Sequence, residues 1–236
     1  MQSVDPNQPV LILGGFLITE EAYTSLASWI QNNQGSIVRV VPSSKFDWLL
    51  TSWAIGWRRL LDRVDAIVQD LQSRSHTGKV TLIGHSSGGV MLRLYLGDQP
   101  FLGRIYSGYK SCNRLITLGS PHQAVRATPL RAQVNTLYPA SFYADHVDYF
   151  SIAGRLSLDS PNASQFAKYT AANSYRSISD DPLLQGDGLV PVCSALLAQS
   201  RDLVLNDTAH GGLFGTTWYG SIERVEQWWP YAMGFA

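Results

Sequence analysis

The stretch of the chain with the clearest chemical meaning is Gly84-His85-Ser86-Ser87-Gly88, which matches the pattern G-x-S-x-G. An apolar run from residue 79 precedes it, and the residues up to Leu92 fit the apolar face of a helix. A serine at the tip of a sharp strand-to-helix turn exposes its hydroxyl, and flanking glycines remove Cβ atoms that would clash there. The motif therefore predicts that Ser86 is a nucleophile. The alternative is a plain Gly/Ser loop between two elements.

A serine hydroxyl needs a base that takes its proton, and the base must be held by a third group. Of the five histidines, His210 alone lies near the C-terminus beyond a last predicted strand, in the segment N-D-T-A-H-G-G at 206–212. Such a loop can bring an imidazole over the carboxyl end of a sheet. We therefore expect His210 to be the base, rather than a solvated loop histidine.

The best candidate for the acid is Asp187, within G-D-G-L-V-P at 186–191. Glycines on both sides allow a tight turn and a close approach to the histidine, although an ordinary Asp-Gly turn would look the same. Asp159, Asp180 and Asp181 are rivals. In the expected mechanism His210 moves the proton of Ser86 to the leaving group, and Asp187 fixes the tautomer of His210.

Two backbone N–H groups are expected to bind the oxyanion that forms during acyl transfer. One is that of Ser87, directly after the nucleophile. The other comes from the loop after the first buried strand, where Gly14-Gly15-Phe16 stands. Phe16 N–H is the preferred donor and Leu17 the second choice, while a plain glycine turn is the alternative.

The elements that must position these residues follow from apolar patterning. Strands are expected at 9–13, at 36–41, from 79 to the elbow, and at 114–118, 146–153 and 203–205. Helices are expected at 19–33 (capped by Thr19), at 57–73, after the elbow and at 216–229. This alternation predicts one α/β domain over residues 1–236 with a mostly parallel sheet. Segment 43–56 has no clear class, and segments 123–145 and 155–185 are excursions that could form a cap.

Composition narrows the choice of function class. Hydrophobic residues make up 45% of the 236 positions, charged residues only 15%, and the formal net charge is zero, which argues against a nucleic-acid partner. Cys112 and Cys193 are expected to be buried, unpaired thiols, although one disulfide is the alternative. No signal peptide and no apolar run of about 20 residues is seen, so a soluble, cytoplasmic protein is expected. A precursor trimmed at its N-terminus would look the same.

Four segments together carry a resemblance to a known family: PVLILGGF at 9–16, LIGHSSGG at 82–89, LGSPHQ at 118–123 and GDGLVPVCSA at 186–195. With His210, they resemble the lipase and esterase branch of the α/β-hydrolase superfamily, in particular its triacylglycerol-lipase-like and GPI-inositol-deacylase-like members. The resemblance implies a mostly parallel sheet flanked by helices, cleavage of a carboxylic ester, and no metal or other cofactor. Those proteins often carry His-Gly after the first strand, where this chain has Gly14-Gly15.

A few aromatic and loop residues are candidates for contact with the substrate. The aromatic-rich segment with Trp48, Trp53 and Trp57 could line an acyl pocket or contact a lipid surface, and core packing is the alternative. Trp53, Gly15, Leu17 and His122 are candidate pocket residues, and for His122 a structural role is the stronger reading. We expect a small-molecule or lipid ester as the partner, and the oligomeric state stays open. An acyltransferase with the same triad, or a slow-turnover binding or sensor protein, is the competing function.

Overall fold

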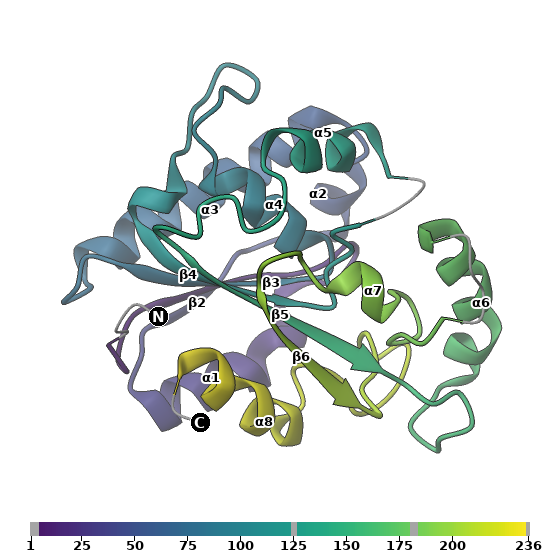
Figure 1. Cartoon of the computed structure of the whole chain (residues 1–236). Helices are drawn as coiled ribbons and strands as arrows, with labels where there is room; N and C mark the ends of the chain where they lie inside the picture. Colours follow the sequence, from purple (N-terminus) through teal and green to yellow (C-terminus); the bar gives the residue numbers. More distant parts are fainter. Residues whose placement is uncertain (1–4, 124–126, 180–183, 235–236) are drawn as a thin grey trace.

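The computed structural model describes residues 5–123, 127–179 and 184–234, and a six-stranded sheet runs through its centre (Figure 1). The strand order is β2-β1-β3-β4-β5-β6, and every neighbouring pair is parallel. The strands are β1 Val10–Leu13, β2 Val38–Val40, β3 Val80–His85, β4 Cys112–Leu118, β5 Asp148–Arg155 and β6 Arg201–Asn206. All carboxyl ends of the strands therefore meet at one edge, where the predicted site residues follow β1, β3 and β6.

Helices cover both faces of the sheet. The helices are α1 Thr24–Gln34, α2 Lys45–Leu50, α3 Ala54–Ser73, α4 Ser87–Leu96, α5 Pro129–Leu137, α6 Gln165–Ser179, α7 Val192–Ala195 and α8 Ile222–Met233, with short 3-10 helices at Glu20–Tyr23 and Gly108–Lys110. Helices α2 to α5 lie over one face, and α1 and α8 over the other (Figure 1). The near-continuous apolar strands are buried because both faces are covered, as in parallel sheets generally.

The starts of α1 and α3 differ from the sequence-based expectation. Thr19 makes no side-chain capping bond; a 3-10 turn follows it, and α1 begins only at Thr24. The unclassified segment 43–56 contains α2, which begins with a capping box in which Ser44 and Asp47 each bond the other's backbone N–H. Helix α3 then begins at Ala54, three residues before the expected start.

Both excursions contain a helix that periodicity did not indicate. In the first, Thr128 caps α5 and Pro129 occupies its first turn, a favourable arrangement at a helix start. In the second, α6 buries small side chains, Ala167 and Ala171, so its inner face carries little apolar signal. The final helix begins at Ile222, six residues later than expected, because residues 216–221 form turns before it.

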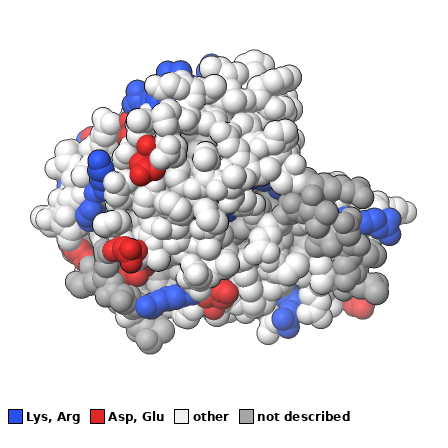
Figure 2. Space-filling model, turned by 45° about the horizontal axis from the view of Figure 1, so that its top comes forward, with Lys and Arg blue, Asp and Glu red and all other residues white. Residues whose placement is uncertain are grey.

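The cysteines and the surface charge can be compared with the sequence-based expectations. Both cysteines are free; Cys112 is buried as expected, whereas Cys193 is exposed. Figure 2 shows that uncharged residues form most of the face seen there, in keeping with the small charged fraction. Across the described ranges, no helix combines the length and apolar character that crossing a bilayer requires.

Candidate active site

Ser86 lies on the turn between β3, which ends at His85, and α4, which begins at Ser87. Its backbone has φ 53° and ψ −127°, a conformation that L-residues rarely adopt, and its N–H donates to Leu118 O at 2.9 Å. The turn is so tight that a Cβ on Gly84 would lie 2.4 Å from Gly89 Cα. The glycine before the elbow is therefore a steric requirement, and Ser86 is held at the carboxyl edge of the sheet.

The loop after β6 brings His210 to Ser86. His210 Nε2 lies 2.9 Å from Ser86 Oγ, and His210 Nδ1 lies 2.8 Å from Asp187 Oδ2. A carboxylate can only accept, so Nδ1 carries the proton and Nε2 is free to accept the Ser86 hydroxyl proton. All three side chains are buried, at 6%, 2% and 0% exposure for Ser86, His210 and Asp187. The structure thus brings the three residues predicted as a triad into one continuous hydrogen-bonded chain.

Asp187 has three further donors. Leu189 N–H and Val190 N–H bond its Oδ1 at 3.0 and 2.7 Å, and the Tyr219 hydroxyl bonds its Oδ2 at 2.8 Å. Burial, followed by the nearby Asp187 charge, raises the pKa of Tyr219 well above its ordinary value, so Tyr219 stays a donor. These contacts fix the carboxylate against His210. Its rival Asp159 is exposed, and Asp180 and Asp181 lie outside the described residues.

The loop after β1 approaches Ser86 from the other side. A Cβ on Gly15 would lie 2.7 Å from Ser86 Cβ, so only glycine allows the loop so near. Ile18 N–H closes a turn onto Gly15 O at 3.1 Å, and Leu17 has φ 61° in it. Phe16 N–H bonds no other described residue, and Ser87 N–H, in the first turn of α4, has no carbonyl within the helix to bond. Both N–H groups therefore lack an acceptor among the described residues and remain the candidate oxyanion donors.

Tyr23 and His85 form a buried pair that supports this loop, and sequence reasoning did not single them out. The Tyr23 hydroxyl accepts from Gly15 N–H at 3.0 Å and lies 2.7 Å from His85 Nδ1; His85 Nε2 lies 2.8 Å from His210 O. Since a carbonyl only accepts, His85 Nε2 carries the proton and Tyr23 donates to Nδ1. Burial, and then the charge of His210, hold the pKa of His85 well below its ordinary value. The pair joins the loop after β1 to the loop after β6.

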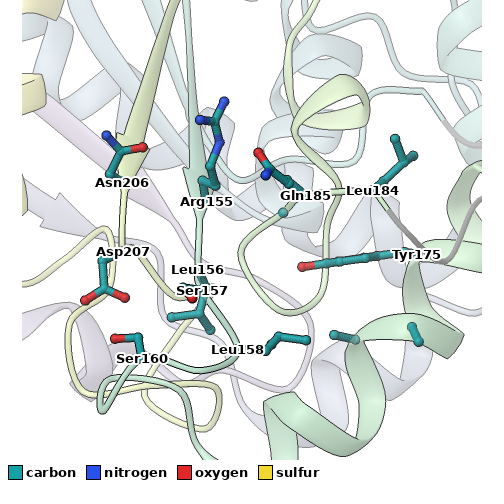
Figure 3. A pocket seen from close by; sticks show the side chains of 13 residues that line it. Arg155, Leu156, Ser157, Leu158, Ser160, Tyr175, Leu184, Gln185, Asn206 and Asp207 are labelled. Carbon is teal, nitrogen blue, oxygen red and sulfur yellow. The ribbon is translucent and has the colours of Figure 1, made fainter.

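Two cavities open on Ser86. One, of about 590 Å³, is largely apolar; Leu17 and His210 line it, as do Phe16, Ile18, Phe166, Leu189, Leu213, Phe214 and Trp218. The second, of about 400 Å³, extends past Ser87 toward α5 and the end of α6. A third cavity, of about 520 Å³, lies beyond β5 and β6 between Arg155, Tyr175 and Asp207 and is lined by none of the three triad residues (Figure 3). The two cavities at Ser86 are therefore the candidate substrate sites.

Only some of the predicted pocket residues line the two cavities at Ser86. Leu17 lines the apolar cavity, and Gly15 packs against Ser86 without lining either cavity. His122 and Trp53 line neither: His122 is buried between Thr117 and Arg93, and Trp53 is 63% exposed. Trp48 and Trp57 are buried in the core, and Trp57 also lines the second cavity. Within the described ranges, no three His, Cys, Asp or Glu side chains are grouped as metal ligands.

The contact residues that sequence reasoning missed are Tyr23, His85 and Tyr219. His85 stands inside the G-x-S-x-G motif, and a histidine next to the nucleophile on a buried strand is a signal that could have been used. Tyr23 and Tyr219 carry no such signal, because their partners lie 62 and 32 positions away in the chain.

We expect Tyr23→Phe to lower kcat roughly tenfold or more with little change in KM, because it leaves Gly15 N–H and His85 Nδ1 buried without partners. Steady-state kinetics on an activated ester measures both parameters. Tyr231→Phe is the matched control, since that hydroxyl bonds Asp202 O at the opposite end of β6. Equal losses in both variants would contradict a specific role for Tyr23.

Stability should fall in mild acid. Burial also lowers the pKa of His122, so the folded chain keeps His85 and His122 neutral while the unfolded chain protonates both below about pH 6.5. The free energy of unfolding should then drop by up to about 1.4 kcal/mol per pH unit for each histidine. Urea titrations across this range measure the slope. His122→Asn should reduce it, with His76→Asn at an exposed turn as control, and a flat profile would contradict the assignment.

Comparisons with known proteins support the fold. Solved structures with a similar fold include one described as a cell surface hydrolase from Lactobacillus plantarum WCFS1, with 14% identity, a TM-score of 0.52 and coverage of 96% of this chain and 91% of that chain. Another is a truncated carbohydrate esterase from gut microbiota, with 11% identity, a TM-score of 0.53 and coverage of 99% and 87%. These likenesses confirm the predicted α/β-hydrolase fold.

Sequence comparisons add the family. No curated protein matches the chain. The model of the palmitoyl protein thioesterase family matches residues 9–176, a span that begins at β1, includes the elbow and ends inside α6. This match covers well over half of the 236 residues and confirms the expected membership of the lipase and esterase branch. The chain belongs to the palmitoyl protein thioesterase family.

Proposed function

We propose that the protein hydrolyses acyl esters through an acyl-enzyme on Ser86, with fatty acyl thioesters as its preferred substrates. The observation that carries the proposal is the unbroken chain from Ser86 Oγ through His210 to Asp187, with contacts of 2.9 and 2.8 Å. Family membership supports an ester-cleaving or thioester-cleaving hydrolase. The thioester is an extension of the sequence-based expectation, which considered oxygen esters alone.

The reaction follows from the hydrogen bonds. Ser86 Oγ attacks the acyl carbonyl carbon as its proton passes to His210 Nε2, and the carbonyl oxygen becomes an oxyanion bound by Phe16 N–H and Ser87 N–H. The oxyanion collapses, the bond to the leaving sulfur or oxygen breaks, and that atom takes the proton from His210 Nε2. Water then loses a proton to His210 Nε2 and attacks the acyl-enzyme. As the second tetrahedral intermediate collapses, Ser86 Oγ takes this proton back and the acid is released. Asp187 holds Nδ1–H throughout and stabilises the imidazolium.

The apolar cavity supports an acyl chain as the group transferred to Ser86. Its aromatic and aliphatic lining surrounds His210 and Ser86, and no Asp, Glu, Lys or Arg is among its described lining residues. Burying methylene groups there stabilises the bound substrate by about 0.8 kcal/mol each. Longer chains should therefore bind more tightly until the cavity of about 590 Å³ is full.

Kinetics on matched octanoyl esters of a thiol and of an alcohol test the proposal. We expect the wild type to hydrolyse both with a higher kcat/KM for the thioester, and Ser86→Ala to be inactive. Asp187→Asn should lower kcat about 10⁴-fold, because it removes the acceptor that fixes the tautomer of His210. Near-normal turnover in Asp187→Asn would move the role to Asp159, Asp180 or Asp181, and hydrolysis by Ser86→Ala would contradict the mechanism.

A further inference from the structure

The second cavity at Ser86 has, unlike the first, a charged side chain in its described lining. The lining is largely apolar, and it also contains the Arg131 guanidinium and the hydroxyls of Ser52, Ser87 and Thr128. The Thr51 and Ser177 hydroxyls, which also line it, donate to backbone carbonyls. No aspartate or glutamate is among its described lining residues. A described lining with a cation, free hydroxyls and no carboxylate favours a negatively charged group beside the cation.

Arg131 is the unusual member of this lining. It is half-buried in the third position of α5, and its backbone N–H bonds the capping Thr128 hydroxyl. Its side chain makes no hydrogen bond or ion pair with any described residue, whereas Arg63 pairs with Asp47 and Arg104 with Asp65. Burial lowers the pKa of Arg131, and no charge of a described residue acts against that shift. The cation is thus partly removed from water without a partner among the described residues.

An unpaired, half-buried guanidinium raises the free energy of the empty protein and favours binding of an anion. Removing a charge from water without pairing it destabilises the structure, and a carboxylate or phosphate bound by guanidinium restores the lost interactions. Because an ester has two arms on its carbonyl carbon, and two cavities meet at Ser86, each arm has a place. The first cavity, with no charged side chain in its described lining, suits the acyl chain, so the second cavity, with Arg131, remains for the leaving group.

We propose that Arg131 binds an anionic group, a carboxylate or a phosphate, on the leaving thiol or alcohol of the substrate. This inference rests on the proposed function, since the leaving group is defined by attack of Ser86. The anionic group lies near the scissile carbonyl, because Arg131 and Ser86 line the same cavity of about 400 Å³.

A matched pair of thioesters tests the inference: S-octanoyl-N-acetylcysteine, which carries a carboxylate, and its primary amide, which is neutral. We expect the wild type to prefer the carboxylate roughly tenfold or more in kcat/KM, after correction for the non-enzymatic hydroxylaminolysis rate of each thioester. Arg131→Gln should bring the ratio close to one, and Arg131→Lys should keep part of it. Arg131→Met is a second neutral variant if the glutamine variant does not fold.

Arg74→Gln is the control, because Arg74 is an exposed partner of Asp70 at the end of α3, and it should keep the wild-type ratio. A second pair, p-nitrophenyl hydrogen glutarate and p-nitrophenyl pentanoate, moves the charge to the acyl arm. A preference seen only with this pair would overturn the assignment to the leaving group, as would equal kcat/KM for both thioesters or an unchanged ratio in Arg131→Gln. If the wild type hydrolyses none of the four compounds, the proposed function fails and the inference with it.

Discussion

The buried carboxylate of Asp187 is the interaction on which the candidate site depends. A carboxylate without contact to water destabilises a fold by several kcal/mol unless donors surround it. Asp187 has four, and they come from its own turn, from the loop after β6 and from the segment before α8. Asp187 therefore connects its own turn, the loop after β6 and the segment before α8. Its bond to His210 Nδ1 fixes the orientation of His210.

Close packing and two buried side chains hold the loop after β1 beside Ser86. The loop after β1 can approach the strained Ser86 backbone only because Gly15 in that loop has no side chain. Tyr23 and His85 then connect that loop to the His210 backbone through two neutral, buried groups. In proteins of the resembled branch a histidine often stands before the glycine of this loop; here Tyr23 supports the loop from a neighbouring 3-10 turn.

How far the sequence predicts the site depends on whether a residue's role is local. Ser86, Asp187 and His210 stand in glycine-marked turns after or between predicted strands, so their meeting could be expected from chain order alone. Tyr219 and Tyr23 act across the fold, and nothing near them in the sequence indicates their partners. Helix α6 was missed because Ala167 and Ala171 stand beside Tyr175 on its buried face and give little apolar signal. Trp53 was misjudged because it is exposed, while Trp48 and Trp57 beside it are buried.

The proposed mechanism requires Ser86 to be the nucleophile, and labelling with a fluorophosphonate probe tests this most directly. The probe forms a covalent bond with a serine only when a base activates it, so labelling is independent of the substrate. We predict that the folded wild type is labelled, that peptide mapping places the label on Ser86, and that Ser86→Ala is not labelled. A folded wild type that stays unlabelled, or a label on another residue, would contradict the account.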